Sequence, residues 1–355
     1  MKIFFDVPHL YYLPQYLPVY QELLQHGITA EFLFYRAGNP VDVMQQVITQ
    51  EQLTAHWVTD EAESIRFYAA RQPDWLIIGN RKKQLDTLPA TVKTALMQHG
   101  IGPKSCYYDV SEHPTTVRFV EGQHRLQRLH QRFPQAQFVD TGYAKLDPLL
   151  KGQPLGVTLS ALKLDPARPT LLYAPTFYPS SLECFSEHFP RHFSGYNLII
   201  KPHYFSLTKA DYKKQRDLLQ YWAAQPNVYL APVTDYNLLP FMQLADIMLS
   251  DASSAIFEFA ALGKPVIWCN FYKLRWSYRG ILGFRLKKRL DPDILYFRQL
   301  STEITAYRQL EDAVEQAIQL PAGAIATRNN ALIRELAGET DGKCSERIAA
   351  TLLTM

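Results

Sequence analysis

The 355-residue sequence lacks long apolar runs, paired cysteines and a strong charge of either sign. No stretch approaches the roughly eighteen apolar residues of a membrane-spanning helix, so we expect any membrane contact to be peripheral. The opening residues, MKIFFDVP, contain an apolar run too short for a signal peptide, and we interpret them as a buried strand. The formal net charge of +3 gives no support to nucleic-acid binding.

Cysteines and histidines show no metal-ligand spacing. The cysteines are far apart and form no CxxC pair: Cys106, Cys184, Cys269 and Cys344. We interpret them as reduced thiols of a cytoplasmic protein. Without a zinc-type motif such as HExxH, the sequence predicts no metal site and no obligatory cofactor. Mg²⁺ accompanying a bound nucleotide stays open.

One basic run, Arg285-Leu-Lys-Lys-Arg289, interrupts the otherwise balanced charge distribution. It is typical of a solvated loop, and it also suits attraction to an anionic membrane or a polyanionic acceptor. Both interpretations stay open.

The chain is long enough for two domains, and its hydrophobic content of 47% suits a substantial core. Short apolar runs alternate with helical patterns, which predicts parallel sheets covered on both faces. Predicted strands are 2–7, 28–35, 75–79, 137–140, 170–174, 196–201, 228–230, 246–249 and 266–268, the last of these ending its sheet; predicted helices are 16–26, stopped by Gly27, then 89–98 and 209–224.

The alternation stops at a polar, turn-rich segment at about 149–169 and then restarts, which predicts an interdomain linker. We therefore expect Rossmann-like, doubly wound domains at 1–150 and 165–330. A C-terminal helix within 331–355 is expected to pack back toward the first domain. Ligands of such sheets bind beyond the carboxyl ends of the strands, so we expect the two domains to face a central cleft.

The most informative stretch is 244–268, which predicts a strand, a polar turn, an apolar helix and a second strand. The turn contains Ser250, Asp251, Ser253 and Ser254. Backbone N–H groups at the start of a helix suit a phosphate or diphosphate. Serine and aspartate are also ordinary helix caps, and capping has the same geometry.

Polar residues follow other predicted elements as well. Lys201-Pro-His203 could bind a diphosphate and stabilise its departure. The alternative is that these are surface residues without a role in binding. Glu258, one helical turn past Ser254, could hold ribose hydroxyls or lie on a helix surface. His99 could accept a proton near neutral pH, or could cap the end of a predicted helix. Gly100 permits close approach of a ligand to the backbone.

Six motifs in one order resemble the CDP-glycerol glycerophosphotransferase family, which includes polymerases and primases of teichoic-acid synthesis and relatives in capsule synthesis. They are His99-Gly100; Thr141-Gly-Tyr-x-x-x-Asp147; Leu172-Tyr-Ala-Pro-Thr176; Lys201-x-His203; the stretch from Ala245 to Ile267; and Asp341-Gly-x-x-Ser-Glu-Arg347. The resemblance extends from about residue 95 to the end.

The resemblance implies a GT-B fold and transfer of glycerol phosphate or a related polyol phosphate from a CDP donor, with release of CMP. It implies His99 as general base, His203 near the donor diphosphate, and Asp251 as a catalytic residue that orients a histidine or the donor. Donor-binding residues on this basis are Gly100, Lys201, Ser250, Ser253, Ser254, Glu258 and Thr176. Gln98, where the family has tryptophan, and Ala252, where it has tyrosine, depart from the pattern.

A glycan or a lipid-linked saccharide is the expected acceptor, in cell-envelope polymer synthesis at the inner face of the plasma membrane. A GT-B glycosyltransferase or nucleotide-sugar 2-epimerase that uses a UDP-sugar is the nearest alternative. A catalytically silent nucleotide-binding member of a glycan-assembly complex is a further one.

Overall fold

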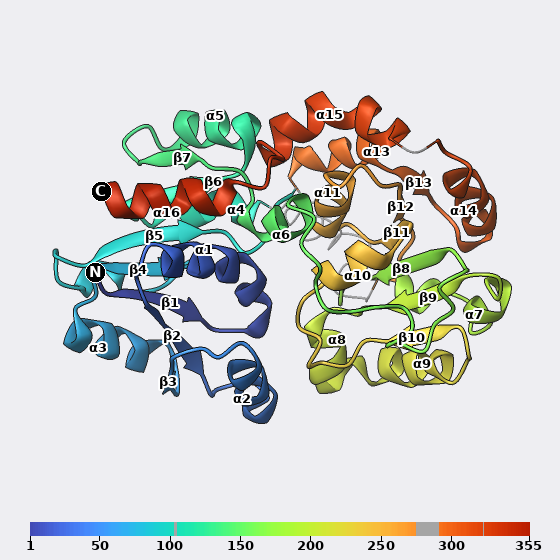
Figure 1. Ribbon diagram of the computed structural model, residues 1–355, viewed down its shortest axis with the longest axis horizontal. Coiled ribbons are helices and arrows are strands. Elements are labelled where there is room, and N and C mark those ends of the chain that lie inside the picture. Colours follow the sequence, from blue (N-terminus) through green and yellow to red (C-terminus); the bar gives the residue numbers. More distant parts are fainter. Residues whose placement is uncertain (103–104, 275–290, 322) are drawn as a thin grey trace. The chain divides into compact units, whose positions relative to one another are not determined.

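The computed structural model describes residues 1–102, 105–274, 291–321 and 323–355, so the basic run 285–289 lies outside the described residues. The chain divides into two compact units (Figure 1). Unit 1 comprises residues 1–101, 106–152 and 334–355, and unit 2 comprises 102–105 and 153–333.

Unit 1 is built on a seven-stranded parallel sheet with strand order β3-β2-β1-β4-β5-β6-β7. The strands are β1 (Ile3–Val7), β2 (Ala30–Tyr35), β3 (Ala55–Val58), β4 (Trp75–Ile78), β5 (Lys93–Met97), β6 (Val117–Val120) and β7 (Phe138–Asp140). Every residue of β1 is buried, which explains why all of them except Asp6 are apolar. This order is that of a Rossmann-like domain and confirms the predicted fold class.

Helices cover the sheet of unit 1. They are α1 (Leu13–Gln25), α2 (Val41–Gln50), α3 (Glu61–Arg71), α4 (Cys106–Asp109), α5 (Gly122–Arg132), α6 (Asp147–Leu150) and α16 (Cys344–Thr354). α1 ends in a Schellman motif, in which the N–H of Ile28 donates to the carbonyl of Leu23 at 3.0 Å. Gly27 supplies the left-handed residue that this motif needs, with φ of +73°, so the predicted stop is confirmed.

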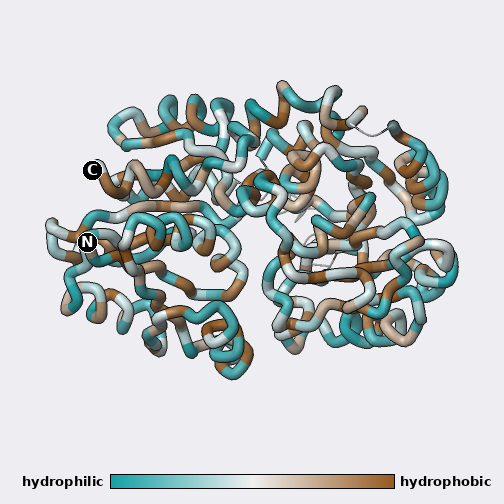
Figure 2. The backbone as a smooth tube through the Cα atoms, in the orientation of Figure 1, coloured by the Kyte–Doolittle hydropathy of each residue, from teal (hydrophilic) through white to brown (hydrophobic). Residues whose placement is uncertain are grey.

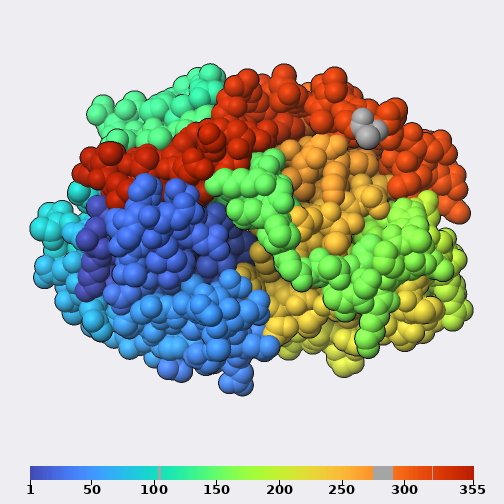
Figure 3. Space-filling view, in the orientation of Figure 1, coloured from blue at the N-terminus to red at the C-terminus, as the bar shows by residue number. Residues whose placement is uncertain are grey.

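The C-terminal helix α16 belongs to unit 1 and packs against α1 (Figure 3). Its carbonyl at Leu352 accepts a hydrogen bond from the buried indole of Trp75 at 3.0 Å. The first and last segments of the described chain are therefore parts of one core.

Unit 2 is built on a six-stranded parallel sheet with order β10-β9-β8-β11-β12-β13. The strands are β8 (Thr170–Ala174), β9 (Asn197–Ile200), β10 (Val228–Leu230), β11 (Ile247–Ser250), β12 (Val266–Cys269) and β13 (Thr302–Ile304). The central strands of both sheets are strongly hydrophobic (Figure 2). The second sheet repeats the Rossmann-like order of the first, as the sequence predicts.

The helices of unit 2 are α7 (Phe189–His192), α8 (Tyr204–Thr208), α9 (Lys213–Ala223), α10 (Leu239–Leu244), α11 (Ala255–Ala260), α13 (Phe297–Leu300), α14 (Leu310–Ile318) and α15 (Ala324–Ala337). The last of these crosses from unit 2 into unit 1. Within the predicted linker, Asp165 is fixed to β9, because its carbonyl accepts a hydrogen bond from the Asn197 amide at 2.8 Å.

Two predictions are wrong. The helix predicted at 89–98 is strand β5, which pairs with β4 and β6. Its alanine, leucine and methionine have high helix propensity, but burial between two strands decides their conformation. The second sheet does not end at 266–268, because β13 pairs with β12.

Among the described residues, no helix combines the length and the apolar character needed to cross a bilayer.

Lys82 and Asp6 form a buried ion pair near the carboxyl end of strand β1. Lys82, which is 4% exposed, places its Nζ atom 3.0 Å from Oδ1 of Asp6 in β1. The hydroxyls of Tyr35 and Tyr68 donate to the same oxygen at 2.6 and 2.8 Å. Lys82 also donates to Ser64 Oγ at 2.8 Å. These bonds tie the segment after β4 to β1, β2 and α3.

We expect Lys82→Met to destabilise the protein by about 3 kcal/mol or more, because it leaves the Asp6 carboxylate buried without its counter-charge. Lys213→Met is the matched control: the Lys213–Asp217 pair is exposed, and its loss should cost less than about 0.5 kcal/mol. Urea unfolding measures both. Equal effects of the two substitutions would contradict this role of Lys82.

Candidate active site

The predicted donor-side residues of unit 2 follow neighbouring strands at one edge of the sheet. β9, β8 and β11 are adjacent, and Lys201, the segment 175–181 and Asp251 come directly after their carboxyl ends. Carboxyl ends of parallel strands lie at the same edge, so these segments form one candidate site.

His203 caps helix α8. Its Nδ1 atom accepts a hydrogen bond from the backbone N–H of Phe205 at 3.1 Å. In the neutral ring, therefore, Nδ1 carries the lone pair and Nε2 carries the proton. The imidazole packs against the Phe177 ring, with 4.7 Å between centroids. Nearby, Lys201 is anchored by its backbone N–H, which donates to the Tyr173 carbonyl at 2.9 Å.

Asp251 is fully buried and fixes the segment after β8. Its Oδ2 atom accepts from the backbone N–H of Thr176 at 2.9 Å and from the Ser180 hydroxyl at 3.0 Å. Its Oδ1 atom accepts from the N–H of Ser181 at 3.1 Å and from the Ser181 hydroxyl. Burial raises the pKa of Asp251 to about 6, although these donors oppose the rise. These contacts make Asp251 a positioning residue for 176–181, and its predicted catalytic role stays a prediction.

The three predicted serines differ in what they can offer a ligand. Ser250 is fully buried, and its hydroxyl donates to the Ala174 carbonyl at 2.7 Å. Ser253 and Ser254 are partly exposed in the turn before α11, where Ser253 Oγ accepts from the Ala255 N–H at 3.3 Å. Ser250 therefore ties β11 to β8, and the turn at Ser253 and Ser254 is the part that solvent reaches.

Glu258 lies in the first turn of α11 and is 1% exposed. The alternative of an ordinary surface position for Glu258 is therefore wrong.

Thr176, also predicted to bind the donor, is partly exposed, and its hydroxyl donates to the Pro179 carbonyl at 2.6 Å.

Gly102 belongs to unit 2 and packs against α11 and the turn before it. Gly102 has φ of +119°, and a Cβ atom there would lie 3.1 Å from the Phe257 ring and 3.5 Å from the Ser254 Cα atom. Glycine is thus favoured at this position by both backbone conformation and space.

His99, in unit 1, follows strand β5, so the alternative of a histidine at a helix C-cap is wrong. Its backbone N–H and its Nδ1 atom lie 3.2 and 2.9 Å from the Gly79 carbonyl. Because a carbonyl only accepts, Nδ1 carries the proton in the neutral ring and Nε2 carries the lone pair. Gly100, which follows, is buried.

Aromatic side chains that were not predicted as site residues surround His99. Centroid distances from its ring are 4.6 Å to Tyr12, 5.3 Å to Tyr11 and 5.8 Å to Tyr107. Tyr143, from the Thr-Gly-Tyr motif, donates its hydroxyl to the His99 carbonyl at 3.1 Å. Of these four tyrosines, only Tyr143 belongs to a motif that the sequence analysis identified.

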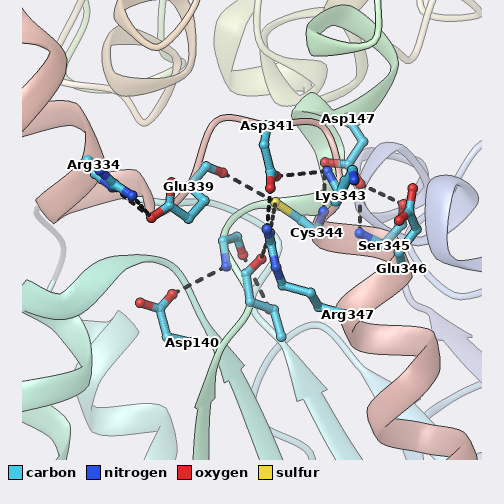
Figure 4. A network of polar contacts seen from close by, with 12 residues as sticks. Asp140, Asp147, Arg334, Glu339, Asp341, Lys343, Cys344, Ser345, Glu346 and Arg347 are labelled. Atoms are coloured by element: carbon cyan, nitrogen blue, oxygen red, sulfur yellow. Dashed lines mark hydrogen bonds and ion pairs between the residues drawn. The ribbon is translucent and has the colours of Figure 1, made fainter.

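The C-terminal motif binds the Thr-Gly-Tyr-x-x-x-Asp motif within unit 1 (Figure 4). The buried carboxylate of Asp147 accepts from the backbone N–H groups of Cys344 at 3.2 Å and Ser345 at 2.6 Å, and from the Ser345 hydroxyl at 2.6 Å. Arg347 pairs with Asp341 and donates to the Thr141 carbonyl at 3.4 Å. Asp147 thus caps the first turn of α16 from another part of the chain.

Glycines allow these segments to approach closely. A Cβ atom on Gly338 would lie 2.7 Å from the Gly142 Cα atom, and one on Gly142 would lie 2.5 Å from Cys344 Sγ. Both glycines also have positive φ. The tail motif is therefore a structural clamp on the segment that carries Tyr143.

The predicted site residues fall into two groups, one per unit: His99 and Gly100 in unit 1, and Thr176, Lys201, His203, Ser250, Asp251, Ser253, Ser254 and Glu258 in unit 2. Across the described residues, no group of three or more histidine, cysteine, aspartate or glutamate side chains could hold a metal ion.

A family model described as CDP-Glycerol:Poly(glycerophosphate) glycerophosphotransferase matches residues 104–287, more than half of the chain. The chain belongs to this family. The match includes Lys201-x-His203 and the stretch from Ala245 to Ile267, and so confirms the resemblance read from those residues.

Among curated relatives of this glycerophosphotransferase family member, teichoic acid glycerol-phosphate primases from Bacillus spizizenii and Bacillus subtilis strain 168 are 29% and 30% identical over 114 and 119 residues. The matched segment covers 32% of this chain and spans only 28% of each primase.

Solved structures share the fold. The wall teichoic acid polymerase TagF superposes with a TM-score of 0.68 at 14% identity, over 99% of this chain and 88% of that chain. UDP-GlcNAc 2-epimerase from Neisseria meningitidis gives 0.62 at 15% identity, over the full length of both chains. Both likenesses establish a GT-B-type fold for the family member and nothing about its substrate.

The raised pKa of Asp251 predicts a pH-dependent stability. The native protein retains the proton that the unfolded chain releases near pH 4, so stability from this group falls as pH rises through about 6. Relative to Asp251→Asn, which cannot titrate, the wild type should lose roughly 2 kcal/mol between about pH 4.5 and 7. Urea unfolding at both pH values measures this difference. A wild type that gains stability over the interval would contradict the prediction.

We expect Asp147→Ala to destabilise unit 1 by about 2–4 kcal/mol, because buried N–H groups of α16 lose their acceptor. Hydrogen exchange of the α16 amides should accelerate. Asp341→Ala is the control within the same motif, since its partly exposed pair with Arg347 should contribute less than about 1 kcal/mol. Unchanged exchange in α16 would refute the clamp.

Proposed function

We propose that this protein transfers glycerol phosphate, or a related polyol phosphate, from a CDP-activated donor to a hydroxyl of a glycan or lipid-linked saccharide, releasing CMP. The observation that carries the proposal is the opposite hydrogen bonding of the two motif histidines. His99 donates through Nδ1 to Gly79, which leaves a basic Nε2; His203 accepts through Nδ1 from Phe205, which leaves Nε2 as a donor.

These two states suit the two ends of one displacement. The acceptor oxygen forms a bond to the glycerol-bearing phosphorus, and its proton passes to His99 Nε2. The bond from that phosphorus to the oxygen bridging to CMP breaks, and CMP departs with this oxygen. Nε2–H of His203 and the Lys201 ammonium stabilise the negative charge that develops there.

The other predicted residues assist the donor side. We propose that the backbone at Ser253 and Ser254 contacts the diphosphate and that Glu258 holds the cytidine ribose. Asp251 acts indirectly, by fixing Thr176 and the segment after it. Gly102, also in unit 2, lies against the turn at Ser253 and Ser254. Support for the donor comes from the family match, and TagF has been solved after soaking with CDPG.

The acceptor assignment rests on the relatives that are teichoic acid glycerol-phosphate primases. We propose a role in synthesis of a teichoic acid-like or capsule polymer of the cell envelope. The protein would act in the cytoplasm, with peripheral contact to an anionic membrane, and Mg²⁺ would enter only with the nucleotide.

The decisive assay follows CMP release from CDP-glycerol with a lipid-linked saccharide acceptor. His99→Asn should lower kcat by about 10²–10⁴ through loss of the base, and His203→Asn by about 10²–10³ through loss of a charge-stabilising donor. His26→Asn and His192→Asn, both remote from these motifs, are controls expected to retain activity. Normal turnover in both His99→Asn and His203→Asn would sink the proposal.

Thermal-shift measurements separate the alternatives. CDP-glycerol or CDP-ribitol should raise the Tm, and UDP-GlcNAc should not. Protection by UDP-GlcNAc alone would favour a UDP-sugar enzyme. Binding of CDP-glycerol without turnover on any acceptor would point to a silent nucleotide-binding member of a glycan-assembly complex.

A further inference from the structure

Gln98 lies beside His99 at the end of β5, where its side chain is 4% exposed. Its amide faces the imidazole, with Nε2 of Gln98 placed 3.3 Å from Nδ1 of His99. The other amide atom, Oε1, is buried without a hydrogen-bond partner among the described residues. A buried amide in contact with a proposed catalytic base needs a physical explanation.

The position of the His99 proton explains why a buried amide lies here. Nδ1 of His99 lies 2.9 Å from the Gly79 carbonyl, which can only accept, so Nδ1 carries a proton. A protonated Nδ1 cannot accept from the Gln98 amide. Rotating the amide by half a turn exchanges its oxygen and nitrogen, which are nearly identical in shape. Oε1 then accepts from Nδ1–H and gains the partner that it otherwise lacks.

We propose that Gln98 is a positioning residue: its amide oxygen and the Gly79 carbonyl share the Nδ1 proton of His99 and so keep the basic lone pair on Nε2. The inference rests on the proposed role of His99 as general base. It concerns a position at which this chain departs from the family pattern, which usually has tryptophan where Gln98 stands.

Four tyrosines also contact His99. Tyr11, Tyr12 and Tyr107 pack around the ring, and their phenols are the titratable groups among these neighbours. Tyr143 holds the backbone carbonyl of His99. Aromatic packing restricts the position of a ring, but only hydrogen bonds in its plane select one tautomer.

Two substitutions separate this role from simple packing. Gln98→Met preserves the volume and removes the acceptor, so kcat should fall about tenfold or more. Gln98→Glu preserves the shape and strengthens the acceptor. It should raise the pKa of His99 by about one unit or more and move the acid limb of the pH profile of kcat/KM to higher pH.

If Gln98 only fills space, Gln98→Glu should be the more damaging of the two substitutions. Gln98→Met would then resemble the wild type, and Gln98→Glu would lower the Tm because it buries a charge, without raising the pKa of His99. That pattern would overturn the inference, and retained kcat in Gln98→Met would do so by itself.

Long-range ¹H–¹⁵N correlation spectra of protein labelled with [¹⁵N]histidine provide a readout that needs no substrate. The His99 signals are identified by their loss in His99→Asn. We expect the Nδ1–H tautomer in the wild type and a larger Nε2–H population in Gln98→Met. An Nε2–H tautomer in the wild type would refute the inference about Gln98. The proposed function would then still be tested by the CMP-release assay. Normal turnover in His99→Asn would refute that function, while the spectra still decide the role of Gln98.

Discussion

A buried carboxylate must receive hydrogen-bond donors, and three buried aspartates satisfy this constraint by binding distant segments of the chain. Asp6 draws the segment after β4 onto β1 through Lys82. Asp147 captures the first turn of α16. Asp251 holds the segment after β8. In each case the donors come from a part of the chain that is distant in the sequence, and the contact fixes where that part lies.

The parts of the fold with local causes could be predicted from the sequence. Predominantly apolar runs such as Ile3–Val7 indicate strands buried on both faces, and Gly27 ends α1 as expected. Lys201 and His203 follow β9, and the serine-rich turn follows β11, because parallel strands deliver their loops to one edge. The order of strands and loops along the sequence is therefore enough to predict where the candidate site lies.

Other features depend on partners that lie far away in the sequence. Thr94 to Met97 is a strand because β4 and β6 flank it, whereas its residue types favour a helix. The contact between Asp147 and Ser345 joins residues 198 positions apart. Sequence motifs marked both residues and gave no sign that one binds the other. The tautomers of His99 and His203 likewise depend on contacts with the backbone of Gly79 and Phe205, whose positions only the folded chain defines.

Unit 1 is discontinuous, and this has a consequence for the order in which the protein forms on the ribosome. Residues 1–152 emerge first, but α16 of the same unit is synthesised only after all of unit 2. At roughly 5–20 residues per second, the delay is on the order of ten seconds or more. During that time Trp75 and Asp147 face a surface that their helix has not yet covered, while unit 2 already has every strand of its sheet. The half of the protein that is made first is therefore the last to be completed.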